Sequence, residues 1–173
     1  AKGIEPMSVM SLMARLGSAD PVELRDTVQE IIDGFELGKF GVAPTKFDVL
    51  DLEPLTARIN AAKPFDAVKD EVLALGVPAH LAETFWTVVR ENITFMSDMA
   101  EWWTLFRDGA PALVDDEDRE MIETAFSLLG EPAYTADTWG EWTNAVKEAT
   151  GRKGKGLFMP LRKAVTGRAS GPD

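Results

Sequence analysis

Residues 138–165 read TWGEWTNAVKEATGRKGKGLFMPLRKAV, and this stretch decides the expected fold. Its first half has apolar residues at helical spacing. Thr138 with Glu141 has the spacing of a capping box, which predicts a helix start there. A glycine-rich basic hinge follows at residues 151–156, and residues 157–165 predict a second helix that is both apolar and basic. Two such helices around a hinge are typical of a mainly α-helical protein.

The same pattern extends upstream over most of the chain. Apolar residues recur at helical spacing between Gly and Pro residues, which predicts about eight or nine helices in all. A helix should start at Asp20-Pro21. Its expected buried face is Leu24, Val28, Ile31, Ile32 and Phe35. The other expected upstream helices are residues 7–16, 52–62, 65–75, 78–93, 94–106 and 115–129.

Two features interrupt this helical pattern. Residues 34–51 are rich in glycine and predict short extended pieces or a long ordered loop. Lys63-Pro64 marks a plausible boundary, because a proline disfavours helix at the residue before it. The expected fold class is therefore mainly all-α with little or no β, and Pro160 is expected in the first turn of its helix.

Composition excludes several kinds of site. The chain has 173 residues, of which 45% are apolar, so a packed core is expected. It has no Cys, and His80 is its only His, which excludes disulfides, thiolate metal sites and a Cys nucleophile. The acidic run at residues 115–118 lacks the spacing of a calcium loop. We expect no catalytic residue and no metal site in this chain.

Targeting signals are also missing from the pattern. No apolar run reaches the roughly 18 residues that span a bilayer. Residues 1–5 lack an initiator Met and do not form a signal peptide. We therefore expect a cytoplasmic protein without a membrane partner, and a fragment of a longer chain.

Charge is distributed unevenly. The net charge is −11, yet residues 151–173 carry six Lys and Arg against one Asp. Residues 1–150 carry 12 Lys and Arg against 28 Asp and Glu. A basic end with exposed backbone N–H groups favours anion binding. The alternatives are a solvated basic tail and, for Arg162, an ion pair with a neighbouring carboxylate.

The basic end also carries a family resemblance. Residues 151–167, GRKGKGLFMPLRKAVTG, followed by Gly171-Pro172, resemble the terminal signature of bacterial glutamyl-tRNA synthetases. Residues 3–7, GIEPM, and residues 12–17, LMARLG, resemble the segment that follows the catalytic domain in that family. Residues 46–48, Lys-Phe-Asp, resemble its K-F-D element. The order of these elements agrees, so the resemblance covers essentially the whole chain.

The resemblance implies a C-terminal fragment of a class I synthetase. Residues 1–63 would be the stem-contact region, and residues 64–173 the anticodon-binding domain, an α-helical cage. The catalytic domain would be absent, so this chain alone would hold no cofactor. The parent enzyme would use ATP and Mg²⁺ to attach glutamate to tRNA. A monomer that binds tRNA and not DNA is implied.

The resemblance also implies site residues. Arg162 would lie beside the anticodon, and Gly171-Pro172 would touch anticodon nucleotides. Thr166 and Gly167 would shape the turn that leads there. Electrostatics adds candidate phosphate contacts from the same basic end. These are Arg152, Lys153, Lys155 and Arg168.

Two positions depart from the family pattern. Members that accept only glutamate tRNA often carry an arginine where this chain has Asn92, which implies that glutamine tRNA is also accepted. Thr56 stands where relatives often have Asn in the stem-contact helix. The alternative function is a helical protein–protein interaction domain whose basic tail binds an acidic partner.

Overall fold

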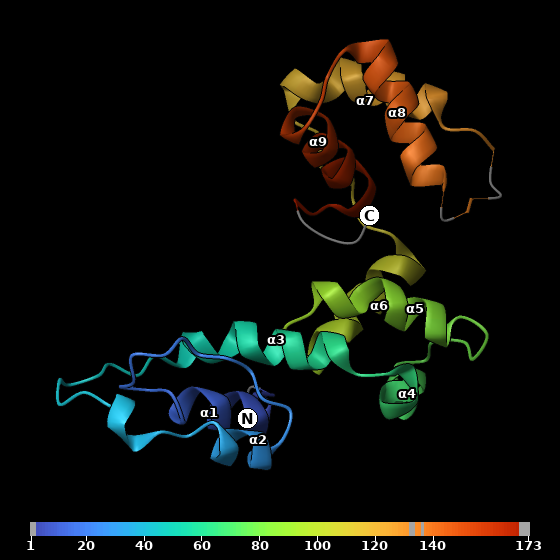
Figure 1. Cartoon of the computed structure of the whole chain (residues 1–173). Coiled ribbons are helices and arrows are strands. Elements are labelled where there is room, and N and C mark those ends of the chain that lie inside the picture. The colour runs from blue at the N-terminus through green and yellow to red at the C-terminus, as the bar shows by residue number, and fades with distance from the viewer. Residues whose placement is uncertain (1–2, 132–133, 136, 170–173) are drawn as a thin grey trace. The chain divides into compact units, whose positions relative to one another are not determined.

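The computed structural model describes residues 3–131, 134–135 and 137–169 and confirms a mainly all-α protein (Figure 1). No strand occurs in those ranges; the single β-bridge joins Ser18 and Phe40. None of the described helices is long and apolar enough to cross a membrane. The α-helices are α1 Pro6–Met13, α2 Val28–Asp33, α3 Leu52–Ala62, α4 Phe65–Ala74, α5 Ala82–Val89, α6 Met99–Asp108, α7 Arg119–Leu128, α8 Thr138–Thr150 and α9 Lys155–Thr166. The 3₁₀ helices are η1 Leu37–Lys39, η2 Val49–Asp51, η3 Arg90–Asn92, η4 Met96–Asp98 and η5 Asp116–Asp118.

The chain forms two compact units. Unit 1 is Ala1–Trp103 and unit 2 is Thr104–Asp173, so the boundary falls within α6. Lys63 lies inside unit 1, where its carbonyl accepts a hydrogen bond from Trp86 Nε1 at 3.1 Å. The expected division after residue 63 is one between functional regions and stays a prediction.

Helix α1 packs through a mixed face, in which Leu12 joins Leu52 and Leu55 of α3 and two serines are buried beside it. Its buried residues are Ser8, Ser11 and Leu12, whereas Met10 and Met13 are exposed. The Ser8 and Thr56 hydroxyls are 3.0 Å apart, and both residues are fully buried where α1 meets α3. The expected helix over residues 7–16 therefore ends earlier, at Met13, and its buried face is only partly apolar. Small hydroxyl side chains let the two helices approach closely.

The helix expected from Asp20 is also wrong. Helix α2 begins at Val28, with the Thr27 hydroxyl accepting from the N–H of Glu30 at 3.2 Å. Upstream, the backbone N–H of Arg25 donates to Ser11 Oγ at 3.1 Å. That bond ties the segment to α1. In the expected helix, the same N–H would instead donate to a carbonyl of its own helix. No residue of α2 is buried.

The second part of unit 1 has a conventional apolar core made by α4, α5 and α6. Helix α5 begins at Ala82, four residues later than Pro78, because residues 78–81 form a turn closed by Leu81 N–H on the Pro78 carbonyl. Trp86 is the largest fully buried side chain. The core residues from these helices and their connections are Val68, Val72, Val77, Ala82, Phe85, Trp86, Val89, Ile93, Met99 and Trp102.

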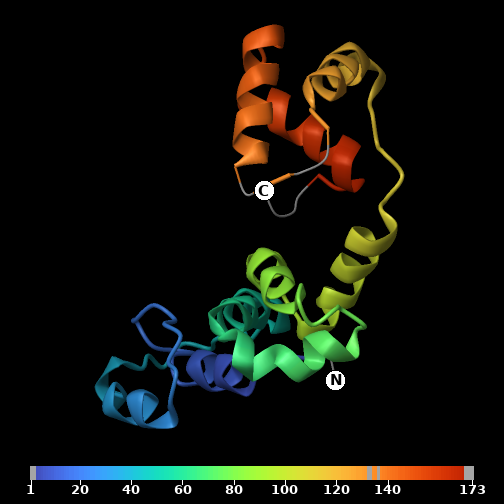
Figure 2. The ribbon, with the colours of Figure 1, turned by 90° about the vertical axis from the view of Figure 1, so that its right-hand side faces the viewer.

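Unit 2 is built from α7, α8 and α9 around one cluster (Figure 2). Trp142 of α8 is 6% exposed and donates its indole N–H to the Ala125 carbonyl of α7 at 2.7 Å. The donor is thereby satisfied inside the core. The buried cluster is Met121, Ile122, Ala125, Trp142, Val146, Leu157, Leu161 and Ala164.

The start of α8 differs from the expected capping box. The N-cap is Asp137, and the Thr138 hydroxyl accepts from the N–H of Thr135 at 2.8 Å. Glu141 donates its backbone N–H to the Asp137 carbonyl at 3.0 Å, as in an ordinary helical turn. Thr138 thus closes the turn before the helix. The expected helix 157–165 is confirmed as part of α9, which is longer at both ends.

The packing predicts a contrast between two positions of α9. Leu161 is fully buried, whereas Val165 is 46% exposed. Leu161→Ala should lower the free energy of unfolding by about 2–5 kcal/mol, because it leaves a cavity in the cluster. Val165→Ala should change it by less than about 0.5 kcal/mol. Urea unfolding followed by tryptophan fluorescence checks both values, and equal losses would contradict the packing described.

Candidate functional site

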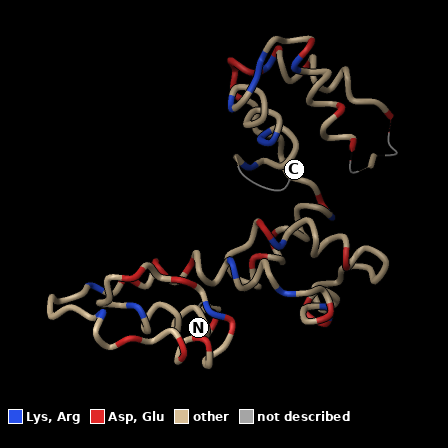
Figure 3. The backbone as a smooth tube through the Cα atoms, viewed as in Figure 1, with Lys and Arg blue, Asp and Glu red and all other residues tan. Residues whose placement is uncertain are grey.

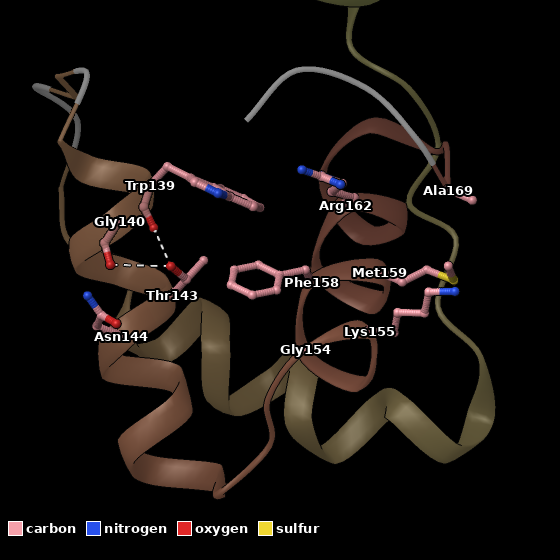
Figure 4. A pocket seen from close by; sticks show the side chains of 10 residues that line it. All are labelled: Trp139, Gly140, Thr143, Asn144, Gly154, Lys155, Phe158, Met159, Arg162 and Ala169. Atoms are coloured by element: carbon pink, nitrogen blue, oxygen red, sulfur yellow. Dashed lines mark hydrogen bonds between the residues drawn. The ribbon is translucent and has the colours of Figure 1, made fainter.

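A cleft of about 700 Å³ lies between α8 and α9 of unit 2. Trp139 comes from α8, and Phe158 and Arg162 come from α9. Figure 4 shows these three side chains pointing into the space between the helices, with the Arg162 guanidinium directed toward the Trp139 ring. The residues lining the cleft are Trp139, Gly140, Thr143, Asn144, Gly154, Lys155, Phe158, Met159, Arg162 and Ala169.

Helical spacing places these groups. Phe158 and Arg162 are four residues apart and share one face of α9. Leu157, Leu161 and Ala164 hold the neighbouring face of α9 in the core. On α8, Trp142 is buried, and the half-buried Trp139 packs beside it with ring centroids 5.6 Å apart. The core therefore orients the walls of the cleft.

The start of α9 depends on Arg152. Pro160 lies in the second turn of the helix, not in the first turn as expected, and its missing N–H leaves the Gly156 carbonyl without its helical donor. Arg152 Nη1 supplies a donor to that carbonyl at 3.3 Å. The same guanidinium pairs with the nearly buried Asp118 carboxylate and donates to the Glu117 carbonyl at 3.0 Å. Arg152 thereby links η5 to the start of α9.

A second ion pair joins Asp115, the N-cap residue of η5, to α9. Lys163 Nζ lies 2.8 Å from Asp115 Oδ2, and this hydrogen bond raises the pKa of Lys163 above its ordinary value. Figure 3 shows acidic and basic segments next to each other in this part of unit 2. Arg152 and Lys163 thus already have carboxylate partners. The role of Arg152 as a phosphate contact stays a prediction, and this pairing weighs against it.

The other cations of the basic end lie in a different setting. Lys153 and Lys155 are exposed, and within the described residues neither forms an ion pair. Lys155 lines the cleft, although Figure 4 shows its side chain directed away from Trp139. Arg168 follows the end of α9 and is half-buried. These positions leave the two lysines able to meet an anion.

Thr166 and Gly167 form the turn that ends α9. The Thr166 hydroxyl donates to the Arg162 carbonyl at 2.8 Å and accepts from the N–H of Arg168 at 3.2 Å. Gly167 has a φ of +66°, and a Cβ there would lie 3.0 Å from the Pro111 carbonyl oxygen. Only glycine combines this conformation with that approach. Gly171 and Pro172, also expected near the site, lie outside the described residues.

Asn92 belongs to unit 1, in η3. Its carbonyl accepts from Trp102 Nε1 at 3.3 Å, and its side-chain Nδ2 donates weakly to the Val88 carbonyl at 3.4 Å. Its amide is partly exposed. Thr56, the other departure from the family pattern, is buried against Ser8 and has no exposed surface.

The cleft combines aromatic faces with the planar cation of Arg162. This combination suits a ligand that has both a flat ring and a negatively charged group. Aromatic side chains and arginine stack on unpaired bases, and the guanidinium fork matches phosphate or a base edge. Within the described ranges no cluster of three His, Asp or Glu could hold a metal ion. Helical spacing alone does not separate Trp139 from the core-facing residues of this helix. In the structure Trp142, three residues on, fills the buried position, and Trp139 lines the cleft.

Comparison with known proteins identifies the family. A family model described as an anticodon binding domain matches residues 56–173. Glutamate–tRNA ligase 1 of Ruegeria pomeroyi is 60% identical over 172 residues, which is 99% of this chain and 39% of the relative. Glutamate–tRNA ligase 2 of Dinoroseobacter shibae is 60% identical over 173 residues, all of this chain and 39% of that relative. The chain thus spans about 39% of the length of these curated relatives.

Solved structures agree in fold. The glutamate-tRNA synthetase of Elizabethkingia anophelis superposes with a TM-score of 0.62 at 23% identity, over 99% of this chain and 37% of that one. The resemblance seen in the terminal signature is confirmed by these relatives, which match this chain with their C-terminal part. Arg162, Thr166 and Gly167 all lie within the matched residues. The chain belongs to the anticodon binding domain family.

Proposed function

We propose that this chain is the tRNA-binding part of a glutamate–tRNA ligase and that unit 2 binds the anticodon. The observation that carries the proposal is the cleft where Trp139 and Arg162 face each other, in a chain of the anticodon binding domain family. The activity of the whole ligase, attachment of glutamate to tRNA with ATP and Mg²⁺, belongs to the part that precedes this region in the relatives. A cytoplasmic monomer is proposed with it.

Recognition of an unpaired base follows from the groups in the cleft. The Trp139 and Phe158 rings offer apolar faces on which a base can stack, and Arg162 offers two parallel donors to a base edge or phosphate. Lys153 and Lys155 then add charge along the path of the RNA backbone. Arg168, with Thr166 and Gly167, completes this proposed surface at the end of α9, and Gly171-Pro172 follow it in the chain.

Binding at the anticodon contributes to a reaction elsewhere on the tRNA. An enzyme can use binding energy from remote parts of a substrate to orient the reacting groups. The proposed role of unit 2 is therefore positioning, and no residue of this chain is assigned to the chemistry. The largely acidic remainder of the chain repels phosphate away from the cleft and so helps to select one orientation.

Arg162 should dominate tRNA binding. Arg162→Ala should weaken binding of glutamate tRNA by about 5- to 150-fold, the value of a lost bidentate contact. Arg119→Ala is the matched control, because Arg119 is an exposed arginine of unit 2 that pairs with Asp116 at 2.9 Å, outside the cleft. Fluorescence anisotropy at low and moderate salt measures both.

The same titration separates this function from a protein-interaction domain with a basic tail. Glutamate tRNA should bind more tightly than an unrelated tRNA, with affinity falling as salt rises. An acidic peptide should not compete at equal charge. Equal binding of every tRNA, or loss of binding in Arg119→Ala alone, would contradict the proposal.

Trp139 should act through its ring. Trp139→Ala should weaken tRNA binding by about 1–3 kcal/mol, the range for one base stacked on an aromatic side chain. Trp139→Phe keeps a stacking face and should retain most of the affinity. Both variants remove the indole and its packing, but only Trp139→Phe keeps an aromatic face. The difference between them therefore measures stacking. Similar losses in the two variants would count against a stacked base.

Asn92 should govern discrimination between two tRNAs. The proposal that glutamine tRNA is also accepted rests on the residue type at position 92. Asn92 has a short amide, whereas an arginine there would reject the anticodon base of glutamine tRNA. Asn92→Arg should therefore lower the affinity for glutamine tRNA relative to glutamate tRNA by about tenfold, within the range for one base contact. Asn92→Gln is the control. Parallel changes for both tRNAs would refute this role.

A further inference from the structure

An apolar surface lies on α2 and the turn that follows it. Val28 and Ile32 are one helical turn apart and share a face, and the N–H of Phe35 closes on the Ile32 carbonyl at 3.2 Å. Val28 is 45% exposed, Ile32 60%, Phe35 47% and Leu37 76%. We call Val28, Ile32 and Phe35 the α2 surface; the exposed Leu37 follows in η1.

The sequence pattern of this segment is that of a buried face. The spacing of Val28, Ile32 and Phe35 predicted burial, yet each of the three stays about half exposed, and the Phe35 ring contacts the Phe40 ring with centroids 5.1 Å apart. Helix α2 has six residues, too few to be stable by itself in water. A short helix with its apolar side uncovered is typical of a segment completed by another protein surface.

Charge indicates what kind of surface that is. Residues 20–39 contain six carboxylates and two cations. Asp33 and Glu36 directly flank the apolar side chains. Phosphates of an RNA would be repelled here, and aliphatic side chains offer them no hydrogen bonds. The α2 surface therefore suits an apolar protein surface.

We propose that the α2 surface packs against the part of the ligase that precedes this region in the curated relatives. This inference rests on the proposed function. The relatives match this chain with their C-terminal part and are more than twice as long, because the chain covers 39% of them. The α2 surface lies in the first quarter of the chain, on the side of the sequence where the relatives continue. One covering surface thus accounts for the apolar pattern and for the missing burial.

The chain contains no Cys, which permits a direct test. Ile32→Cys introduces a single thiol into the α2 surface. Leu128→Cys is the matched control, because Leu128 is 43% exposed at the end of α7 in unit 2. Each variant is made in this chain alone and in a chimera in which the preceding part of the Ruegeria pomeroyi relative is joined to it. The rate of iodoacetamide alkylation of the introduced Cys is measured by peptide mass spectrometry.

Alkylation of Ile32→Cys should be about tenfold or more slower in the chimera than in the chain alone, because burial protects the thiol. Leu128→Cys should react at the same rate, within about twofold, in both proteins. Equal rates for Ile32→Cys would overturn the inference. Alkylation in the chain alone that slows as protein concentration rises would also overturn it, since a second copy would then cover the surface.

Glutamylation of tRNA by the chimera is measured separately. A chimera that charges tRNA while Ile32→Cys stays reactive defeats only the packing proposal. A chimera in which Ile32→Cys is protected but that neither binds nor charges glutamate tRNA defeats the proposed function and leaves the contact standing. The two failures are therefore distinguishable.

Discussion

The candidate site depends on one guanidinium. Arg152 bonds to Asp118 and to the Glu117 carbonyl on η5, and also to the Gly156 carbonyl that Pro160 leaves without a donor. It therefore fixes the start of α9, and the helix in turn presents the cleft residues at regular spacing. Breaking a partly buried ion pair leaves a carboxylate poorly compensated, which is costlier than losing an exposed pair. The guanidinium predicted to contact RNA phosphate thus also holds the start of α9 in place.

Local patterns predicted the helices whose packing is apolar. Helix α4, Phe65–Ala74, ends within one residue of the expected range 65–75 and buries the apolar side chains Val68 and Val72. The largest errors lie in α1 and α2, where buried hydroxyl groups add to the apolar contacts of Leu12. Ser8 meets Thr56, and Ser11 takes the N–H of Arg25. Such bonds join residues distant in the chain, so periodicity alone could not reveal them.

The site was predictable to the extent that it is local. The signature around Arg162 identified α9 and its terminal turn, and the predicted role of Arg162 in binding RNA still awaits its test. Trp139 was missed because its neighbour Trp142 takes the core position, a division set by the packing of α8 on α7. The partner of Arg152 was equally hidden, since Asp118 lies 34 residues upstream.

The glycine that ends α9 has a mechanical consequence. Pro111 lies against Gly167, and the N–H of Leu113 donates to the Lys163 carbonyl at 3.1 Å. The segment between α6 and η5 is therefore held beside the last turn of α9. A displacement of residues 111–113 would therefore act on the last turn of α9, the helix that carries Arg162. A side chain larger than hydrogen at residue 167 would push Pro111 away from α9. The cleft would then no longer respond to movements of residues 111–113.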